Sequence, residues 1–248
     1  MEPTTRIQLC GRLVAEVNGQ RIDQALPGRQ GRLLFAYLVA NRAQPTARDK
    51  LADALWPEGA PAAVDSAVSA LLSKLRRLVG PERLAGRSRL QLLLPNGSWI
   101  DHEAAAEAVH RAEGAAARNE WAEAWGPARV AQHIAARTFL SGEDAPWIEE
   151  WRRRLDDIYL HALELTAQAG LGIGGGELDT GERAARTLVA RAPYRESGYR
   201  FLMQVLAARD NPAEGLRVYE ELRVRLRDEL GTAPSPTTQA LHKRLLSA

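Results

Sequence analysis

The stretch AAVDSAVSALLSKLRRLVG, residues 62–80, decides the fold of the N-terminal part of the chain. On an ideal helix, where successive residues lie about 100° apart, its valines and leucines fall on one face. The opposite face carries small hydroxyls and cations, namely Ser66, Ser69, Ser73, Arg76 and Arg77, with Lys74 at its margin. The pattern therefore predicts a helix over residues 62–79 with one face in a core and a hydroxylated, cationic face outside. Gly80-Pro81 should end this helix, because proline cannot continue it.

Two shorter helices are expected before this one. Leucines and a tyrosine at helical spacing predict a helix over residues 29–41. Thr46 is a suitable N-cap for a second helix over residues 47–55, and Trp56-Pro57 should end that helix.

Short strands are expected on both sides of the helices. Upstream, residues 7–10 and 13–17 are β-compatible, and Asn18-Gly19 should form a tight turn because both residues tolerate positive φ. Downstream, strands are expected near Leu84, at 90–94 and at 99–100, with the basic loop Gly86-Arg87-Ser88-Arg89 between the first two.

This succession of helices and a basic hairpin is suited to binding duplex DNA. A major groove about 12 Å wide admits one helix, and arginine can bind phosphates or grip guanine with two hydrogen bonds. The basic loop would reach an adjacent minor groove, and the N-terminus of a helix suits a phosphate. The residues expected to contact DNA are Thr46, Arg48, Ser66, Ser69, Ser73, Lys74, Arg76, Arg77, Arg87 and Arg89. For a single such helix, the alternative is an ordinary solvated face.

The distribution of charge favours the DNA interpretation. Residues 1–100 contain 14 Lys and Arg against 8 Asp and Glu, a balance of +6. Residues 101–248 contain 19 against 23, a balance of −4. A basic half joined to a mildly acidic half suggests a polyanion-binding module linked to a second module. We therefore expect one domain over residues 1–100 and another over residues 101–248.

The second half is alanine-rich and predicts only helices, over residues 102–117, 120–137, 146–169, 178–192, 195–209, 212–230 and 236–247. Their short connections indicate stacked helical hairpins. Glu182-Arg183-Ala184-Ala185 resembles Glu214-Gly215-Leu216 at an offset of 31, close to the 34-residue tetratricopeptide period. Tryptophans at 121 and 125, and at 147 and 151, form two i, i+4 pairs that should pack between helices; the alternatives are a ligand pocket or a partner groove.

The composition excludes several classes of protein. A single cysteine, Cys10, excludes an internal disulfide framework and a cysteine zinc site. Apolar runs are short and the N-terminus has no secretory pattern, so we expect a cytoplasmic protein without a membrane span. Five scattered histidines form no metal motif, and we expect no metal, cofactor or catalytic site. Gly170–Gly175 fits G-x-G-x-x-G, but the helical residues before it indicate a flexible interhelical loop rather than a dinucleotide site.

Several motifs resemble the Streptomyces antibiotic regulatory protein family. In the first half these are Gly31-Arg32-Leu33-Leu34, Asp49-Lys50-Leu51, Ala54-Leu55-Trp56-Pro57 and Ser73-Lys74-Leu75-Arg76-Arg77-Leu78. In the second half the most specific is Asp228-Glu229-Leu230-Gly231-Thr232-Ala233-Pro234-Ser235-Pro236. This motif ends one helix with glycine and starts another after proline. The resemblance covers nearly the whole chain.

The resemblance implies a mainly α protein in which a winged helix-turn-helix of the response-regulator type precedes an all-α, tetratricopeptide-like bacterial transcriptional activation domain. It implies an activator that binds direct repeats near a promoter, head to tail, as a homodimer or tandem assembly, and contacts RNA polymerase and its sigma factor. One alternative is a helical-repeat adaptor whose winged helix does not bind DNA, because Ser88-Arg89-Leu90-Gln91 stands where the family commonly has a glycine–aromatic pair. Another is a small-molecule sensor with a pocket among the helices.

Overall fold

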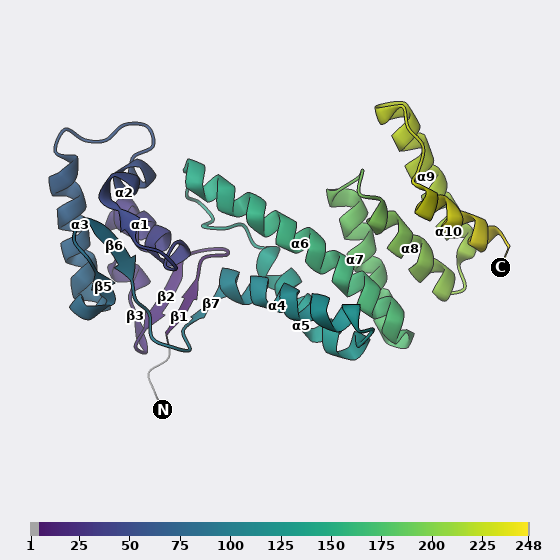
Figure 1. Cartoon of the computed structure of the whole chain (residues 1–248), viewed down its shortest axis with the longest axis horizontal. Helices are drawn as coiled ribbons and strands as arrows, with labels where there is room; N and C mark the ends of the chain where they lie inside the picture. Colours follow the sequence, from purple (N-terminus) through teal and green to yellow (C-terminus); the bar gives the residue numbers. More distant parts are fainter. Residues whose placement is uncertain (1–4, 248) are drawn as a thin grey trace. The chain divides into compact units, whose positions relative to one another are not determined.

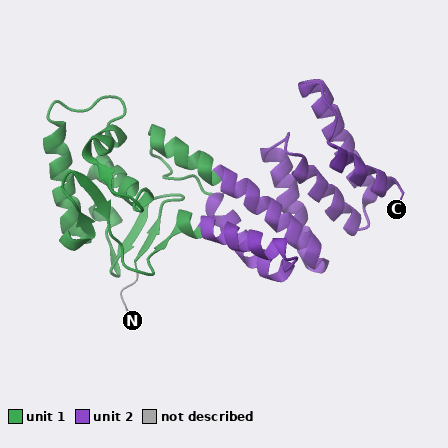
Figure 2. Ribbon diagram, in the orientation of Figure 1, with its two compact units in different colours: residues 1–104, 137–155 green, residues 105–136, 156–248 purple. Residues whose placement is uncertain are grey.

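The computed structural model describes residues 5–247, and these residues are mainly helical (Figure 1). They divide into two compact units (Figure 2). Unit 1 contains residues 1–104 and 137–155, and unit 2 contains residues 105–136 and 156–248. The end of the first stretch of unit 1 lies near the expected boundary at residue 100. Residues 137–155, however, had been expected in the second domain and instead pack with the N-terminal residues.

Unit 1 contains a four-stranded sheet in the order β3-β2-β1-β7. The strands are β1 (Arg6–Gln8), β2 (Val14–Val17), β3 (Gln20–Arg21) and β7 (Trp99–Ile100). β1 pairs antiparallel with β2 and parallel with β7, so that Ile7 lies beside Ala15 and Ile100. The predicted Asn18-Gly19 turn is confirmed, since both residues have positive φ, 54° and 77°.

Three helices and a small second sheet complete the N-terminal part of unit 1. The helices are α1 (Gly28–Ala40), α2 (Arg48–Leu55) and α3 (Val64–Val79). The sheet has the order β4-β6-β5, with strands β4 (Thr46–Ala47), β5 (Leu84–Ala85) and β6 (Arg89–Leu92). Fully buried leucines and Phe35 of α1, together with Leu51 and Leu55 of α2, form the core beneath these helices. The predicted helices and the hairpin around the basic loop are thereby confirmed.

An aromatic cluster joins residues 137–155 to the rest of unit 1. The ring of Trp147 meets that of Tyr37 edge-on at 5.0 Å, and its Nε1 donates to the carbonyl oxygen of Ala54 at 3.2 Å. Phe139 stacks on Trp151, and Cys10 forms a β-bridge with Phe139. The edge-on and stacked contacts of these rings, together with burial of Phe139, are why this segment belongs to unit 1.

Residues 101–247 contain seven α-helices: α4 (Asp101–Ala117), α5 (Trp121–Ala135), α6 (Pro146–Ile173), α7 (Leu178–Arg191), α8 (Glu196–Ala208), α9 (Pro212–Leu230) and α10 (Pro236–Leu246). Short 3-10 helices cover Asp23–Ala25, Pro81–Arg83 and Gly175–Glu177. In unit 2, one core of small side chains lies between α4, α5 and α6, and Trp121 and Trp125 pack against it as predicted. A second core of larger residues, including Tyr199, Met203 and Leu222, joins α6 to α7, α8, α9 and α10.

The prediction of a flexible loop at Gly170–Gly175 is wrong for residues 170–173, because α6 continues to Ile173. The glycines there permit close packing of helices. A Cβ on Gly172 would lie 2.4 Å from the ring of Trp121, and one on Gly170 would lie 3.1 Å from the Cα of Gly181 in α7. The glycine-rich segment is thus the end of a helix, and it does not have the strand–turn–helix geometry of a dinucleotide site.

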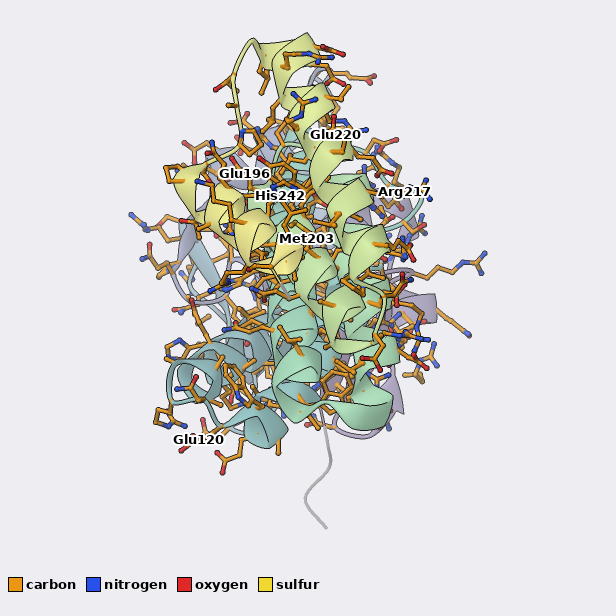
Figure 3. The ribbon with its side chains drawn as sticks, turned by 90° about the vertical axis from the view of Figure 1, so that its right-hand side faces the viewer. Glu120, Glu196, Met203, Arg217, Glu220 and His242 are labelled. Carbon is orange, nitrogen blue, oxygen red and sulfur yellow. The ribbon has the colours of Figure 1, made fainter. Side chains whose placement is uncertain are left out.

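The Leu-Gly-x-x-Pro-Ser-Pro motif fixes the last helix through one carboxylate. Gly231 ends α9 in the left-handed conformation, with φ 65°. Glu196, at the start of α8, accepts hydrogen bonds from the backbone N–H and the hydroxyl of Ser235 and from the hydroxyl of Thr238. A side chain at the start of one helix, labelled in Figure 3, therefore holds the residues at the start of another.

No helix within residues 5–247 combines the length and the apolar character needed to cross a bilayer.

Candidate nucleic-acid interface

Helix α3 has the two faces that its sequence predicts. Val68, Leu72, Leu75 and Val79 are at most 2% exposed and hold the helix against the core. The opposite side is solvent-exposed at Ser66, Ser69, Ser73, Lys74 and Arg77. The predicted inward and outward division of this helix is confirmed, and the hydroxyls and cations are accessible on unit 1.

Arg48 connects the start of α2 to the exposed side of α3. Its Nη2 donates to the hydroxyl of Ser69 at 2.6 Å and to the carbonyl oxygen of Asp65 at 3.3 Å. The backbone N–H of Arg48 donates to the carbonyl oxygen of Ser88, in the turn between β5 and β6. This residue therefore holds α2, α3 and the basic turn together at one point.

Two further arginines brace the turn between β5 and β6. Arg76 of α3 donates from Nη2 to the carbonyl oxygen of Gly86 at 2.9 Å, and Arg89 donates to that of Pro45 at 3.2 Å. Gly86 has φ 87°, and a Cβ there would lie 1.8 Å from the carbonyl oxygen of Arg89, so the turn requires glycine. Gly86 and Pro45 were not among the predicted site residues, although a glycine opening a basic loop was a usable signal.

The cations of this surface have no ion-pair partner in the described part of the chain. Over residues 5–247, no ion pair with a carboxylate is formed by Arg48, Lys74, Arg76, Arg77, Arg87 or Arg89. Elsewhere in unit 1, Arg29 and Arg32 both bind Glu143, and Arg42 binds Glu103 at 2.7 Å. Unpaired cations grouped on one surface create a positive potential, which attracts a polyanion; the acids adjacent to them in the sequence are the exposed Asp49 and Asp65. We call Arg48, Ser66, Ser69, Ser73, Lys74, Arg76, Arg77, Arg87 and Arg89 the α3 surface.

Thr46 does not occupy the place predicted for it. The residue lies in β4, paired with Leu90 of β6, and only 8% of it is exposed. Helix α2 begins two residues later, and Ala47 stands at its N-cap position without a side-chain hydrogen bond. The prediction that Thr46 caps α2 is wrong, because the strand pairing takes that residue out of the helix start. Arg48, in contrast, lies on the α3 surface.

Residues that could have formed a different kind of site are otherwise engaged. Glu149 and Glu150 form ion pairs with Arg152 and Arg154 along α6. His102 is buried and packs edge-on against Trp151 at 4.8 Å. The described part of the chain holds no group of three His, Cys, Asp or Glu side chains placed to bind a metal ion.

The sequence family described as "Bacterial transcriptional activator domain" matches residues 100–246, more than half of the chain. The chain belongs to this family. Its similarity to regulatory proteins also confirms the predicted membership of the Streptomyces antibiotic regulatory protein family. The family match begins within one residue of the expected start of the helical half.

Two regulators show the extent of the similarity. Regulatory protein AfsR of Streptomyces coelicolor is 30% identical over 245 residues, which cover 98% of this chain and 24% of AfsR. Transcriptional regulatory protein EmbR of Mycobacterium tuberculosis is 27% identical over 257 residues, which cover 96% of this chain and 62% of EmbR. The chain thus spans about a quarter of one relative and less than two thirds of the other.

A solved structure of a relative has the same fold. The structure titled "Mycobacterium tuberculosis EmbR in complex with low affinity phosphopeptide" superposes with a TM-score of 0.83 and 24% sequence identity. The match covers 100% of this chain and 66% of that one. At this identity the comparison shows the fold alone: this chain has the same fold as EmbR.

Proposed function

We propose that this chain is a sequence-specific, DNA-binding transcriptional regulator of the activator type, and that it is not an enzyme. The observation that carries the proposal is the α3 surface, where six cations and three hydroxyls have no carboxylate partner among residues 5–247. The relatives named as regulatory proteins support the same function. Such a regulator acts in the cytoplasm, where bacterial DNA lies.

In this proposal, α1, α2, α3 and the β5–β6 hairpin form a winged helix-turn-helix of the response-regulator type over residues 1–100. Helix α3 enters the major groove, because its exposed face is small enough for close approach and rich in donors. The turn between β5 and β6, with Arg87 at its tip, lies over an adjacent minor groove. Residues 101–248 form the tetratricopeptide-like activation domain.

The cations of the α3 surface divide by their internal hydrogen bonds. Arg48, Arg76 and Arg89 are held by their own chain, so their guanidinium groups are fixed and suited to backbone phosphates, which set register. Lys74, Arg77 and Arg87 form no side-chain hydrogen bond within residues 5–247 and extend into solvent. Arg77, on the exposed face of α3, is therefore the residue we assign to base reading.

The partners proposed for the helical half rest on the resemblance to the family. We propose that it contacts RNA polymerase holoenzyme, including the sigma factor, while two copies bind direct repeats near a promoter. The arrangement suits an activator, because one module fixes the position on DNA and the other presents a protein surface. A pull-down of purified holoenzyme by the full chain, on DNA that carries the recovered site and on DNA that lacks it, tests this part.

Sequencing of genomic DNA captured by the purified protein tests the DNA proposal and reports the spacing of half-sites. Arg77→Ala should then weaken binding to the recovered site by about 1–3 kcal/mol and relax specificity at one base position, if Arg77 reads a base. If Arg77 meets a phosphate instead, binding to all sequences should weaken alike and the salt dependence should flatten.

The matched control is Arg153→Ala, which removes an arginine of α6 that is also exposed and forms no ion pair in the described residues. It should leave specific binding unchanged. Recovery of no enriched sequence, together with equal titrations for Arg77→Ala and the unchanged protein, would reject the proposal and favour a protein-binding adaptor.

A further inference from the structure

An aromatic-lined cavity lies within unit 1, between the end of α2 and the start of α6. Its volume is about 430 Å³, which falls in the range of about 300–1,000 Å³ typical of small-ligand sites. The rings of Tyr37, Trp56 and Trp147 form part of its wall, and the exposed Pro57 and Pro146 form part of its rim. The residues that line it are distinct from those of the α3 surface, so a molecule bound here leaves the residues proposed for DNA free.

The three rings, which we call the aromatic corner, present faces that suit a cation. Tyr37 and Trp147 stand at 86° to one another, with ring centroids 5.0 Å apart, and Trp147 is held by its hydrogen bond to Ala54. The Tyr37 hydroxyl and Trp56 Nε1 form no hydrogen bond within residues 5–247. The face of an aromatic ring carries a negative potential, and several such faces around one space bind alkylated ammonium groups.

The cavity also carries one free charge of each sign. Lys50 and Asp53 lie three residues apart on α2 and are exposed, and neither side chain forms a hydrogen bond or an ion pair in the described part of the chain. Burial and the carboxylates of Glu150 and Asp53 raise the pKa of Tyr37, which places negative charge beside the rings. Because Glu150 is paired with Arg154, Asp53 supplies the free negative charge there.

We propose that this cavity binds a small zwitterion, whose alkylated ammonium lies in the aromatic corner near Asp53 and whose carboxylate pairs with Lys50. A simple cation would leave Lys50 unpaired and would be repelled by it, and a simple anion would be repelled by Asp53. A neutral apolar ligand would cover the rings but would leave both charges without a partner. An alkylated ammonium suits the rings better than a bare one, because its alkyl groups bury apolar surface against them.

Ligand-observed NMR of the full chain tests the proposal with glycine betaine, the smallest trimethylammonium carboxylate, as the probe. Saturation transfer from the protein to its methyl protons yields a dissociation constant, which should be roughly millimolar for so small a ligand. The matched ligand is the isostere in which a carbon atom replaces the ammonium nitrogen. The isostere keeps the shape and the carboxylate but lacks the cation, so it should bind about five-fold more weakly.

Two variants separate the contributions of the two ends of the ligand. Trp56→Leu keeps an apolar wall but removes one ring face, so it should weaken binding of glycine betaine about five-fold and that of the isostere less. Lys50→Met keeps the aliphatic stem but removes the charge, so it should weaken both ligands alike, by about two- to five-fold. Glu107→Gln is the control, because this exposed carboxylate of α4 has no hydrogen bond or ion pair in the described residues; it should change neither constant.

The pattern across ligands and variants decides the outcome. Circular dichroism and continued binding of the isostere show that a variant retains its fold and its cavity. Absence of saturation transfer to glycine betaine, equal affinity for the two ligands, or a Trp56→Leu or Lys50→Met protein that binds like the Glu107→Gln control would each overturn the proposal. Since the titration contains no DNA, its failure leaves the proposed DNA-binding function untouched.

Discussion

Asp101 offers the sharpest test of how unit 1 is held together. This residue begins α4 and is fully buried. Its carboxylate accepts hydrogen bonds from the backbone N–H groups of Leu9 at 2.9 Å, Cys10 at 2.8 Å and His102 at 2.9 Å. The first two donors follow strand β1, so a single side chain joins that strand's exit to the first turn of α4. Asp101→Asn keeps the shape of the side chain but replaces one acceptor oxygen by a donor.

The size of the effect follows from these three bonds. Oδ1 accepts hydrogen bonds from the backbone N–H groups of Leu9 and His102, while Oδ2 accepts one from that of Cys10. An amide oxygen in place of Oδ1 preserves two bonds, but both become neutral, and the amide NH2 then faces the N–H of Cys10. A hydrogen bond to a charged group contributes about 1.5–3 kcal/mol, and a buried donor left unpaired costs about 1–3 kcal/mol. We therefore expect Asp101→Asn to lower the free energy of unfolding by about 3–5 kcal/mol, a large share of the 5–15 kcal/mol typical of a domain.

Urea unfolding followed by tryptophan fluorescence measures this effect, because Trp147 and Trp151 lie in the same unit. Asp53→Asn is the control: Asp53 is an exposed residue of α2 in unit 1, and its carboxylate has no hydrogen bond in the described chain. The control should change stability by less than about 0.5 kcal/mol. An Asp101→Asn protein as stable as this control would refute the role assigned to the buried carboxylate.

Three further changes have expected outcomes. Gly172→Ala should destabilise the protein by about 1–3 kcal/mol in thermal unfolding, because the added methyl overlaps an indole ring, whereas Gly176→Ala meets open space; equal effects would contradict the packing. Burial lowers the pKa of His102, so the unfolded chain binds a proton more readily than the folded one. The free energy of unfolding should therefore fall as the pH drops below about 6.5. His102→Phe should reduce this dependence of stability on pH, and an unaltered dependence would count against the assignment. Burial opposes ionisation of Glu196, but hydrogen bonds from two hydroxyls and a backbone N–H outweigh it and lower the pKa of that carboxyl, so its contribution to stability should be present above about pH 4.5 and lost as pH falls. Glu196→Gln should speed hydrogen exchange in α10 at neutral pH, and unchanged exchange would show that these hydrogen bonds do not hold that helix.

The elements themselves were predictable from local pattern. The leucine and valine spacing of residues 64–79 fixed both the extent of α3 and its buried side, since one face of a helix must leave water. Alanine-rich segments with short connections gave the seven helices of the second half within a few residues. The exposed part of the α3 surface was predictable for the same reason, because the polar positions of an amphipathic helix face outward.

Packing across distant parts of the chain was not predictable in this way. The sequence predicted a loop at Gly170 and Gly172 because glycine disfavours helix, yet contacts with α5 and α7 keep these residues helical. The sequence predicted Thr46 as an N-cap because its side chain suits that position, but pairing with Leu90, 44 residues later, places Thr46 in a strand. Arg48, Arg76 and Arg89 form internal hydrogen bonds, whereas the side chain of Arg77 forms none in the described residues. This difference could not be predicted either, because it depends on contacts that only folding brings about, such as those with the turn between β5 and β6.

The order of apolar and polar residues alone established that this chain forms amphipathic helices, which of their faces are apolar, and where a cationic, hydroxyl-rich face would be exposed. Tertiary structure decided that residues 137–155 join the N-terminal unit, and that one carboxylate, Asp101, ties a strand to a helix more than 90 residues away. The physical reason is that the buried side of a strand or helix is marked by apolar residues that repeat every two or 3.6 residues, a pattern visible in any short stretch of sequence. Which partners a side chain meets depends instead on the path of the whole backbone.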